Sequence, residues 1–256
     1  MSGRRFDGKT CLVTGSTGIA AAAARGLAEE GGSVFVVSRT ADHARELAHS
    51  ISGAGWRQAD LAQEEEADAS VAACVERFSR LDCVYNVAGI SGRRFGDGPL
   101  HELTVEGWET VMSANARSAF LVTRAAVRHL LAQGSGGAIL NMSSVLATSP
   151  SPEHFATHAY AASKGAIEAF SRSIAAYYAL DGIRVNVIAP ALVATPMSRR
   201  AQDDPEILAY LADKQPLAGG PIDPADLVGT ALYLLSDDAR IVTGQVIAVD
   251  GGWSAA

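Results

Sequence analysis

The amino-acid sequence predicts a single α/β domain, in which a doubly wound parallel sheet of about seven strands lies between two layers of helices. Short apolar runs of strand length alternate with longer stretches of helical periodicity, the pattern of repeated strand–helix units. The runs are apolar throughout, as expected for strands that are covered on both faces. No low-complexity block, charge run or internal repeat divides the 256 residues, so we expect one domain over residues 1–256.

Each predicted element follows from its own stretch of sequence. Strands are expected at residues 10–13, 34–37, around 56, 83–85, 138–140, 184–188 and 246–249. Helices are expected at residues 19–30, 41–50, 67–78, 105–114, 118–132, 160–180 and 224–235. Pro196, Pro205 and Pro216 surround a short helical stretch, and we expect the segment 195–220 to form a mobile lid. A sheet of this kind binds its ligand at the carboxyl ends of the strands.

The composition argues against several classes of partner. The chain has a net charge of −7 and no basic cluster long enough to form a nucleic-acid face. No apolar run is long enough to cross a membrane, and residues 1–9 lack a signal-like apolar core. The three cysteines have no metal-type spacing, and His154 and His158 have no evident third ligand. We therefore expect a cytoplasmic protein that binds no metal, no nucleic acid and no membrane.

A glycine-containing turn follows the first predicted strand. Residues 14–20 read Thr-Gly-Ser-Thr-Gly-Ile-Ala and lead directly into the first predicted helix. Glycines there let the backbone approach a pyrophosphate, and the free N–H groups of the helix N-terminus attract its charge. The turn predicts a Rossmann-type dinucleotide site with the candidate contacts Gly15, Ser16, Thr17, Gly18 and Ile19.

The end of the second predicted strand bears on the choice of coenzyme. A protein that binds NAD usually carries an acidic residue there, which accepts a hydrogen bond from the ribose 2′-OH. This chain has Ser38 and Arg39 instead, with no acidic residue between Gly32 and Ala41. A guanidinium binds a 2′-phosphate through charge-assisted hydrogen bonds, so we expect NADP(H) to be favoured over NAD(H). The alternative is that Arg39 stacks on the adenine or points to water.

Motifs along nearly the whole chain identify a family. They are Thr14-Gly15, Asp60-Leu61, Asn86-Val87-Ala88-Gly89, Asn115, Asn141-Met142-Ser143-Ser144, Tyr160-Ala161-Ala162-Ser163-Lys164, the run from Arg184 to Pro190, Thr243-Gly244-Gln245 and Asp250-Gly251-Gly252. Because all of these motifs occur in this order, the chain resembles the single-domain branch of the short-chain dehydrogenases/reductases. The resemblance implies reversible hydride transfer between a nicotinamide coenzyme and a small carbonyl or secondary alcohol substrate. It also implies a homotetramer that packs through the helices at residues 118–132 and 160–180; those faces could instead be core.

The resemblance further implies a catalytic tetrad of Asn115, Ser144, Tyr160 and Lys164. Tyr160 and Lys164 are four residues apart, so they lie on one face of the helix expected from residue 160. A nearby ammonium favours the phenolate, and we expect Lys164 to lower the pKa of Tyr160, the proton donor and acceptor. Ser144 would bind the substrate oxygen, and Asn115 would anchor a water that relays protons from Lys164. Ser143 competes for the serine role, but the family pattern favours the second serine of the pair.

Coenzyme contacts beyond the glycine turn are implied by the same resemblance. The adenine would meet Asp60 and Leu61. The floor under the adenosine ribose would be formed by Asn86, Ala88 and Gly89. The nicotinamide would contact Pro190, Val193 and Thr195, and its ribose would contact Tyr160 and Lys164.

The sequence also departs from the family pattern. The second glycine of the phosphate turn, Gly18, comes one residue early. Arg93 and Arg94, in the loop after the fourth predicted strand, form either a solvated pair or a clamp for an anionic substrate group.

Two other functions fit parts of the sequence. One is a protein that senses NAD(P) without turnover, which the intact Tyr160 and Lys164 pair opposes. The other is an epimerase or dehydratase of the longer branch of the family, whose glycine spacing is closer to that of this chain. The short chain and the motifs at Pro190 and Asp250 oppose this second alternative.

Overall fold

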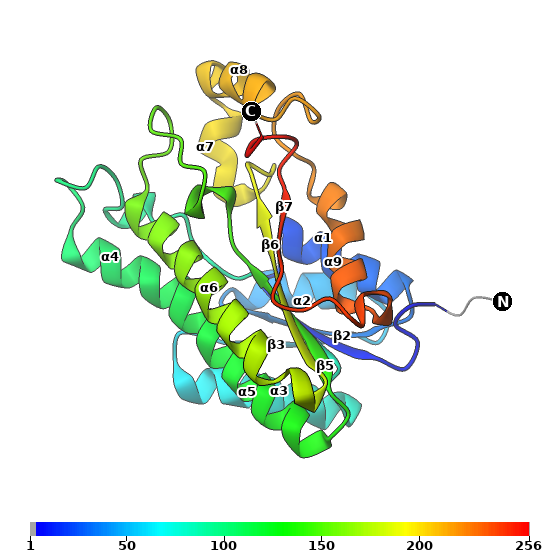
Figure 1. The fold of residues 1–256 in the computed structure, drawn as a ribbon. Helices are drawn as coiled ribbons and strands as arrows, with labels where there is room; N and C mark the ends of the chain where they lie inside the picture. Colours follow the sequence, from blue (N-terminus) through cyan, green and yellow to red (C-terminus); the bar gives the residue numbers. More distant parts are fainter. Residues whose placement is uncertain (1–3, 256) are drawn as a thin grey trace.

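The computed structural model describes residues 4–255 and contains the predicted parallel sheet (Figure 1). Its seven strands lie in the order β3-β2-β1-β4-β5-β6-β7, and every neighbouring pair is parallel. The strands are β1 (Thr10–Thr14), β2 (Ser33–Ser38), β3 (Gly55–Gln58), β4 (Cys83–Asn86), β5 (Gly137–Met142), β6 (Ile183–Pro190) and β7 (Val246–Val249). The order of the strands reverses between β1 and β4, so the switch point that binds ligands lies between these two strands.

Helices cover both faces of the sheet (Figure 1). They are α1 (Ile19–Glu29), α2 (Ala41–His49), α3 (Glu64–Phe78), α4 (Val105–Met112), α5 (Ser118–Gln133), α6 (His158–Tyr177), α7 (Arg199–Gln202), α8 (Pro205–Lys214) and α9 (Val228–Leu235). One buried cluster joins the sheet to α1, α2 and α9, and a second joins its other face to α3, α5 and α6. The three-layer arrangement predicted from the sequence is therefore confirmed.

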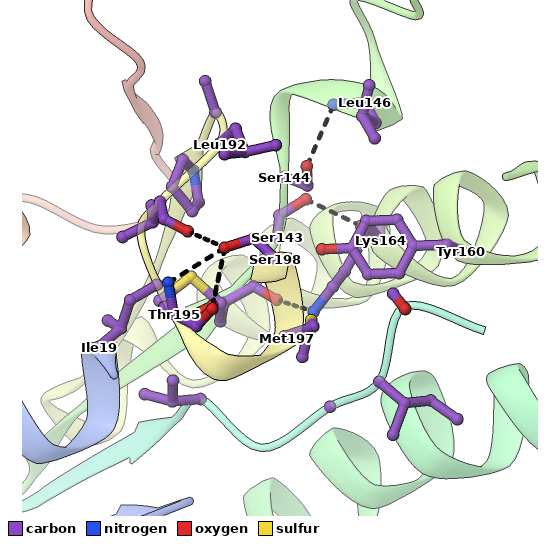
Figure 2. A pocket seen from close by; sticks show the side chains of 18 of the residues that line it. Ile19, Ser143, Ser144, Leu146, Tyr160, Lys164, Leu192, Thr195, Met197 and Ser198 are labelled. Atoms are coloured by element: carbon purple, nitrogen blue, oxygen red, sulfur yellow. Dashed lines mark hydrogen bonds between the residues drawn. The ribbon is translucent and has the colours of Figure 1, made fainter. Parts of the chain in front are cut away.

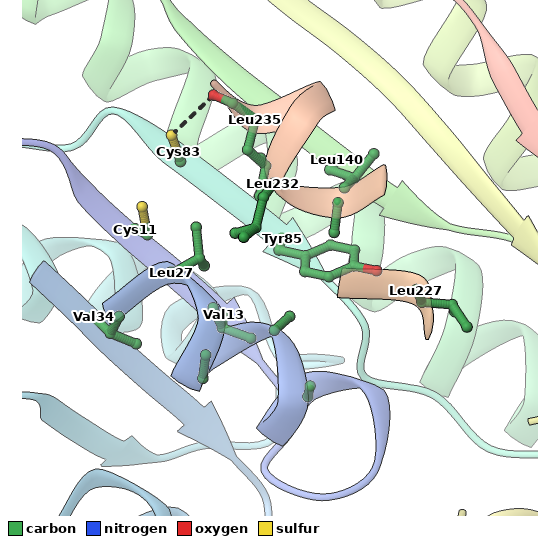
Figure 3. Packing of buried hydrophobic residues seen from close by; sticks show 14 of the residues in the cluster. Cys11, Val13, Leu27, Val34, Cys83, Tyr85, Leu140, Leu227, Leu232 and Leu235 are labelled. Carbon is green, nitrogen blue, oxygen red and sulfur yellow. Dashed lines mark hydrogen bonds between the residues drawn. The ribbon is translucent and has the colours of Figure 1, made fainter. Parts of the chain in front are cut away.

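Alternation along the strands explains why they are apolar throughout. In β1, Cys11 and Val13 face the first cluster, whereas Leu12 faces the second. Figure 3 shows Cys11 and Val13 packed with Leu27 of α1 and Leu232 of α9. Successive strand residues point to opposite faces, so a sheet that is covered on both sides needs apolar residues at every position.

Several element boundaries differ from the prediction. The helix expected from residue 160 begins at His158 and ends at Tyr177, where a 3-10 turn, Ala179–Asp181, follows. A π-helical turn, Ser113–Arg117, joins α4 to α5 and was expected to be part of a plain helix and its link. The segment 195–220 contains two helices, α7 and α8, in place of one short helical stretch. Single-turn features of this kind depend on tertiary contacts more than on local periodicity.

Candidate active site

A cavity of about 270 Å³ opens at the carboxyl ends of the central strands. Its walls come from the glycine turn, the loop after β4, the end of β5, the first turns of α6 and the segment after β6. Figure 2 shows Ser144, Tyr160 and Lys164 gathered on this cavity, with Ile19 and Thr195 on its other side. A second hollow of about 230 Å³ shares the glycine turn with the first and extends over the ends of β2 and β3. Together they form an elongated site at the switch point.

The first turn of α6 is held by a carboxylate from a distant loop. Both oxygens of the buried Asp97 side chain accept backbone hydrogen bonds, from Ala159 at 3.0 Å and from Tyr160 at 2.9 Å. A carboxylate at a helix N-terminus satisfies free N–H groups and complements the helix dipole. Asp97 therefore fixes the backbone position of Tyr160.

Lys164 lies one turn further along the same face of α6. Its side chain is only 3% exposed, and Nζ donates a 2.9 Å hydrogen bond to the carbonyl oxygen of Met142. Nζ lies 5.5 Å from the centroid of the Tyr160 ring. The helix and the end of β5 thus hold the ammonium beside the tyrosine, as the spacing of the two residues predicts.

The two adjacent serines point in different directions. Ser143 is 1% exposed, and its hydroxyl donates to Glu168 at 2.8 Å and lies 3.2 Å from the carbonyl oxygen of Lys164. The Ser144 hydroxyl instead hydrogen-bonds to Tyr160 and accepts from the backbone N–H of Leu146. Because Ser143 is committed to the protein interior, the geometry favours Ser144 as the serine that meets a substrate oxygen.

The electrostatics of Tyr160 differ from the prediction. Burial raises the pKa of Tyr160 above its ordinary value, and the hydrogen bond with Ser144 offsets this only in part. Burial also lowers the pKa of Lys164 from 10.5 to about 8. The expectation that Lys164 lowers the pKa of Tyr160 is therefore wrong for this structure, because removing a phenolate from water outweighs the stabilisation that its neighbours give.

Asn115 lies in the π-helical turn and holds the strand end beside Lys164. Its amide oxygen accepts from the Ile90 backbone N–H at 2.7 Å, and its amide nitrogen donates to the Ile90 carbonyl oxygen and to Ser163. A side-chain carbon on Gly89 would lie 2.8 Å from the Asn115 amide oxygen and 3.6 Å from Lys164 Nζ. Gly89 thus leaves the space that these two polar groups occupy. The proton relay through Asn115 stays a prediction.

The shortened glycine turn has a distinct packing. Gly15 and Gly18 both have positive φ angles, 94° and 52°, and α1 starts directly after Gly18. A side-chain carbon on Gly18 would lie 2.6 Å from the methyl group of Thr195, so the turn presses against the segment after β6. No side chain caps the N-terminus of α1, which leaves N–H donors for an anion at this end of the cavity. The close approach and the free donors fit a bound pyrophosphate.

The second hollow carries the predicted coenzyme selector. Ser38 and Arg39 line it, and Ser16 of the glycine turn donates a 2.9 Å hydrogen bond to Ser38. Arg39 is exposed, and its carbonyl oxygen accepts from Gln58. His43, in the first turn of α2, lines the same hollow and was missed from the sequence, where its helix gave no sign of facing a ligand.

The structure brings most of the predicted coenzyme residues to the two hollows. These are Gly15, Ser16, Thr17, Ile19, Ser38, Arg39, Asp60, Leu61, Ala88, Gly89, Tyr160, Lys164, Pro190, Val193 and Thr195. Gly18 lies behind this lining, against Thr195. Asn86 does not reach either hollow. Its side chain is buried and donates to Thr123 and Asn141, so it links neighbouring elements below the site.

The segment 195–220, the expected lid, contributes residues 195–198, 200 and 201 to the wall of the cavity, and the residues that flank it are anchored to each other. Val193 pairs with Ile222 in a short parallel bridge, and the buried Gln215 side chain bonds to Leu192 and to Gly220. Trp253 is 2% exposed and packs in a small apolar cluster with residues of α7 and α8. Figure 1 shows these two helices beside the C-terminus. The same cluster includes Val145, which follows β5, so α7 and α8 pack onto the body of the protein in this structure, and closure of the segment over a substrate stays a prediction.

The pocket mouth contains residues that the sequence did not single out. Arg93 lines the cavity as the clamp hypothesis requires, but its partner there is Arg200 of α7, and Arg94 is not part of the lining. Phe155 and Trp253 also line it. His158 is exposed, and no cluster of three potential metal ligands occurs among residues 4–255. No helix in this described range is long and apolar enough to cross a membrane.

The fold and the site together define a nicotinamide-dependent oxidoreductase, and known proteins agree with this. Residues 13–254 match the family model described as enoyl-(acyl carrier protein) reductase. A cis-4-hydroxycyclohexanecarboxylate dehydrogenase from Sinomonas cyclohexanicum is 35% identical over 99% of this chain and 99% of its own length. The chain belongs to the short-chain dehydrogenase/reductase family.

Two further relatives extend the comparison. A 3beta-hydroxysteroid dehydrogenase from Eggerthella lenta is 38% identical over 96% of this chain and 94% of its own length. The crystal structure of a gluconate 5-dehydrogenase from Burkholderia cenocepacia, in complex with NADP and tartrate, has a TM-score of 0.91 and 32% identity. It covers 99% of this chain, which spans 98% of that structure. These relatives act on CH–OH groups, so neither the sensing protein nor the epimerase alternative is favoured.

Proposed function

We propose that Ser144, Tyr160, Lys164 and Asn115 carry out the proton transfer of a carbonyl reduction and its reverse. The observation that supports this most is the convergence of Ser144, Tyr160 and Lys164 on one cavity next to the uncapped N-terminus of α1. When bound, the nicotinamide coenzyme supplies or accepts the hydride. A substrate panel, followed by the absorbance of NADPH, tests the assignment as a whole.

The chain's own groups divide the work as follows. The Ser144 hydroxyl donates a hydrogen bond to the substrate oxygen and stabilises its developing charge. The Tyr160 hydroxyl gives its proton to that oxygen in reduction and takes it back in oxidation. Lys164 restores the proton on Tyr160, and Asn115 keeps the backbone at Ile90 in place beside this pair.

The substrate class follows from the apolar part of the cavity. Leu146, Phe155, Leu192 and Trp253 line it together with the catalytic side chains. The relatives named above include dehydrogenases of a hydroxycyclohexane acid and of a hydroxysteroid, both of which carry the alcohol on a ring. We infer that this enzyme accepts a secondary alcohol or ketone on a ring, which the same absorbance assay checks with cyclic against linear ketones.

We also propose that the enzyme prefers NADP(H) and that Arg39 selects it. Arg39 and Ser38 line the second hollow, where an acidic residue would repel a 2′-phosphate. Arg39→Ala is expected to lower kcat/KM for NADPH by about 10- to 100-fold and to leave kcat/KM for NADH within about twofold, since a charge-assisted bond is lost only with the phosphate. Initial rates with each coenzyme measure both values.

Arg45→Ala is the matched control for Arg39→Ala. Arg45 lies in the neighbouring helix α2, pairs with Asp42 and does not line the hollow. It should leave the ratio of the two kcat/KM values unchanged. A wild-type preference for NADH, or an unchanged preference in Arg39→Ala, contradicts this proposal and leaves the oxidoreductase assignment intact.

Assembly into a homotetramer is the next proposal. Exposed apolar side chains lie on α5 and α6, with Phe120 41%, Leu131 43% and Tyr177 77% exposed. A face of this kind gains free energy when a second copy covers it. Phe120→Asp is expected to shift the mass measured by light scattering from a tetramer to a smaller species, whereas Leu100→Asp, in an exposed loop, should not. A monomeric wild type contradicts the proposal.

A cytoplasmic location is proposed as well. The three cysteines, Cys11, Cys74 and Cys83, are free and buried, as in proteins of a reducing compartment. Fractionation of the source cells checks this, and recovery of the protein outside the cytoplasm contradicts it.

A further inference from the structure

Two arginines from separate elements meet at the mouth of the catalytic cavity. Arg93 lies in a short 3-10 turn, Arg93–Phe95, in the loop between β4 and α4, and Arg200 lies in α7 of the lid segment. Both line the cavity. Each directs Nη2 toward the same atom, the carbonyl oxygen of His154, at 2.7 Å from Arg93 and 3.5 Å from Arg200.

No carboxylate within residues 4–255 forms an ion pair with either guanidinium. The charge of Asp97 raises the pKa of Arg93, but both carboxylate oxygens of Asp97 already accept backbone hydrogen bonds from α6. Burial, and secondly the charge of Arg200, lower the pKa of Arg93. The charge of Asp97 opposes this lowering, but no carboxylate of the described residues pairs directly with either guanidinium, so two like charges converge on one cavity and an anionic ligand there would be stabilised.

The surroundings of the pair define where such a ligand would lie. Ser144 and Lys164 are buried in the cavity wall, and the apolar side chains of Phe155, Leu192 and Trp253 line the same cavity. Arg93 and Arg200 are exposed and stand at the rim. A substrate whose reacting carbon reaches Tyr160 would thus place its apolar body in the middle and its far end beside the two arginines.

We propose that this enzyme acts on substrates with an oxyanionic group, a carboxylate or a phosphate, and that Arg93 and Arg200 bind this group at the rim of the pocket. The proposal rests on the proposed function, because it assigns the substrate class of that same site. A guanidinium presents parallel N–H donors that match the oxygens of a carboxylate or phosphate. The shared chemistry is a pair of anionic oxygens; the test below separates the two sources.

The placement of the pair also links binding to the lid. Arg93 belongs to the body of the protein, whereas Arg200 belongs to a helix of the segment 195–220. One anion held by both arginines joins the two parts across the mouth of the cavity. Anionic substrates should therefore close the site, and neutral analogues should not.

The test compares matched probes with NADPH as coenzyme. The carboxylate pair is 4-oxocyclohexanecarboxylate and its carboxamide, and the phosphate pair is dihydroxyacetone phosphate and dihydroxyacetone. The wild type is expected to prefer the anionic member of at least one pair by about tenfold or more in kcat/KM. Arg93→Ala and Arg200→Ala should each raise KM for that anion by about 10- to 100-fold, with kcat and the neutral probe nearly unchanged.

The neighbouring arginines supply matched controls. Arg94→Ala and Arg199→Ala remove the same charge one residue away from each clamp position, and neither side chain lines the cavity. Both should leave KM for the anion within about twofold of wild type. Calorimetric titration of the Tyr160→Phe variant with NADP⁺ and each probe measures binding without turnover.

The outcomes separate the two proposals. Preference for the anion of one pair identifies carboxylate or phosphate as the group that the arginines bind. Equal use of anionic and neutral probes, or equal losses in the Arg93, Arg94, Arg199 and Arg200 variants, overturns the anion site while leaving the catalytic assignment standing. Anion binding in calorimetry that depends on Arg93 and Arg200, without turnover of any probe, supports the anion site and counts against the proposed reaction.

Discussion

Replacing Tyr160 with phenylalanine is expected to lower kcat by about 10²–10⁴-fold, because the variant loses a positioned proton donor. The ring and its packing stay, so coenzyme affinity and folding should be preserved. Initial rates measure the loss, fluorescence titration with NADPH measures the affinity, and circular dichroism checks the fold. A Tyr160→Phe enzyme that retains more than about a tenth of the wild-type rate would show that another group donates the proton.

The raised pKa of Tyr160 also predicts how the rates of the wild-type enzyme depend on pH. Burial keeps the phenol protonated at neutral pH, so the acid form needed for carbonyl reduction predominates there. Reduction by the wild type should therefore be fastest near neutral pH, and alcohol oxidation, which needs the basic form, should speed up as the pH rises. Rates in both directions across the pH range check this, and an oxidation rate that falls with rising pH contradicts it.

Replacing Lys164 with methionine is expected to abolish most turnover and to weaken coenzyme binding, because the variant lacks the ammonium beside Tyr160.

The same replacement should also change how the free energy of unfolding depends on pH. The pKa of Lys164 is about 8 in the folded protein and 10.5 when exposed, so between these values the unfolded chain binds the proton and the folded chain releases it. Stability that depends on Lys164 therefore rises with pH across this window.

Burial of the ammonium below about pH 8 costs the wild type about 3 kcal/mol, from a pKa change of 10.5 to about 8. The unfolding free energy of Lys164→Met minus that of the wild type should fall by about this amount as the pH rises through the window. Urea denaturation on both sides of the window measures it. Lys9→Met, which changes a part-exposed lysine paired with Asp237, is the control and should show a much smaller change. A difference in unfolding free energy between Lys164→Met and the wild type that does not change with pH would contradict the lowered pKa of Lys164.

The sequence predicts the sheet and the close placement of Tyr160 and Lys164 well, for local reasons. Strands that are buried on both faces must be apolar at each position, so runs such as residues 34–37 are visible without any tertiary information. The spacing of Tyr160 and Lys164 places them on one helical face wherever that helix begins. The serine choice rested on family resemblance, and the hydrogen bond between Ser144 and Tyr160 at the cavity wall supports it.

Contacts between segments far apart in the chain could not be predicted from the sequence. Asn86 stands in a coenzyme motif, yet its amide turns inward because Thr123 and Asn141 offer buried partners. Arg93 and Arg94 were indistinguishable as neighbours in the chain, and only the position of α7 brings Arg200 to one of them. The pKa of Tyr160 depends on how much water the folded site removes, which no spacing of residues encodes.

The Asp97 carboxylate ties the loop after β4 to the helix that carries Tyr160. Gly92 packs against Asp97 so closely that a side-chain carbon there would lie 2.8 Å from the Asp97 β-carbon. Residues 93–96 therefore form a short loop between two anchored residues, Gly92 and Asp97. Substitutions within this loop, natural or engineered, can change which substrate is recognised while Tyr160 keeps its position. A graft that discards Asp97 would change selectivity and misplace the chemistry at the same time.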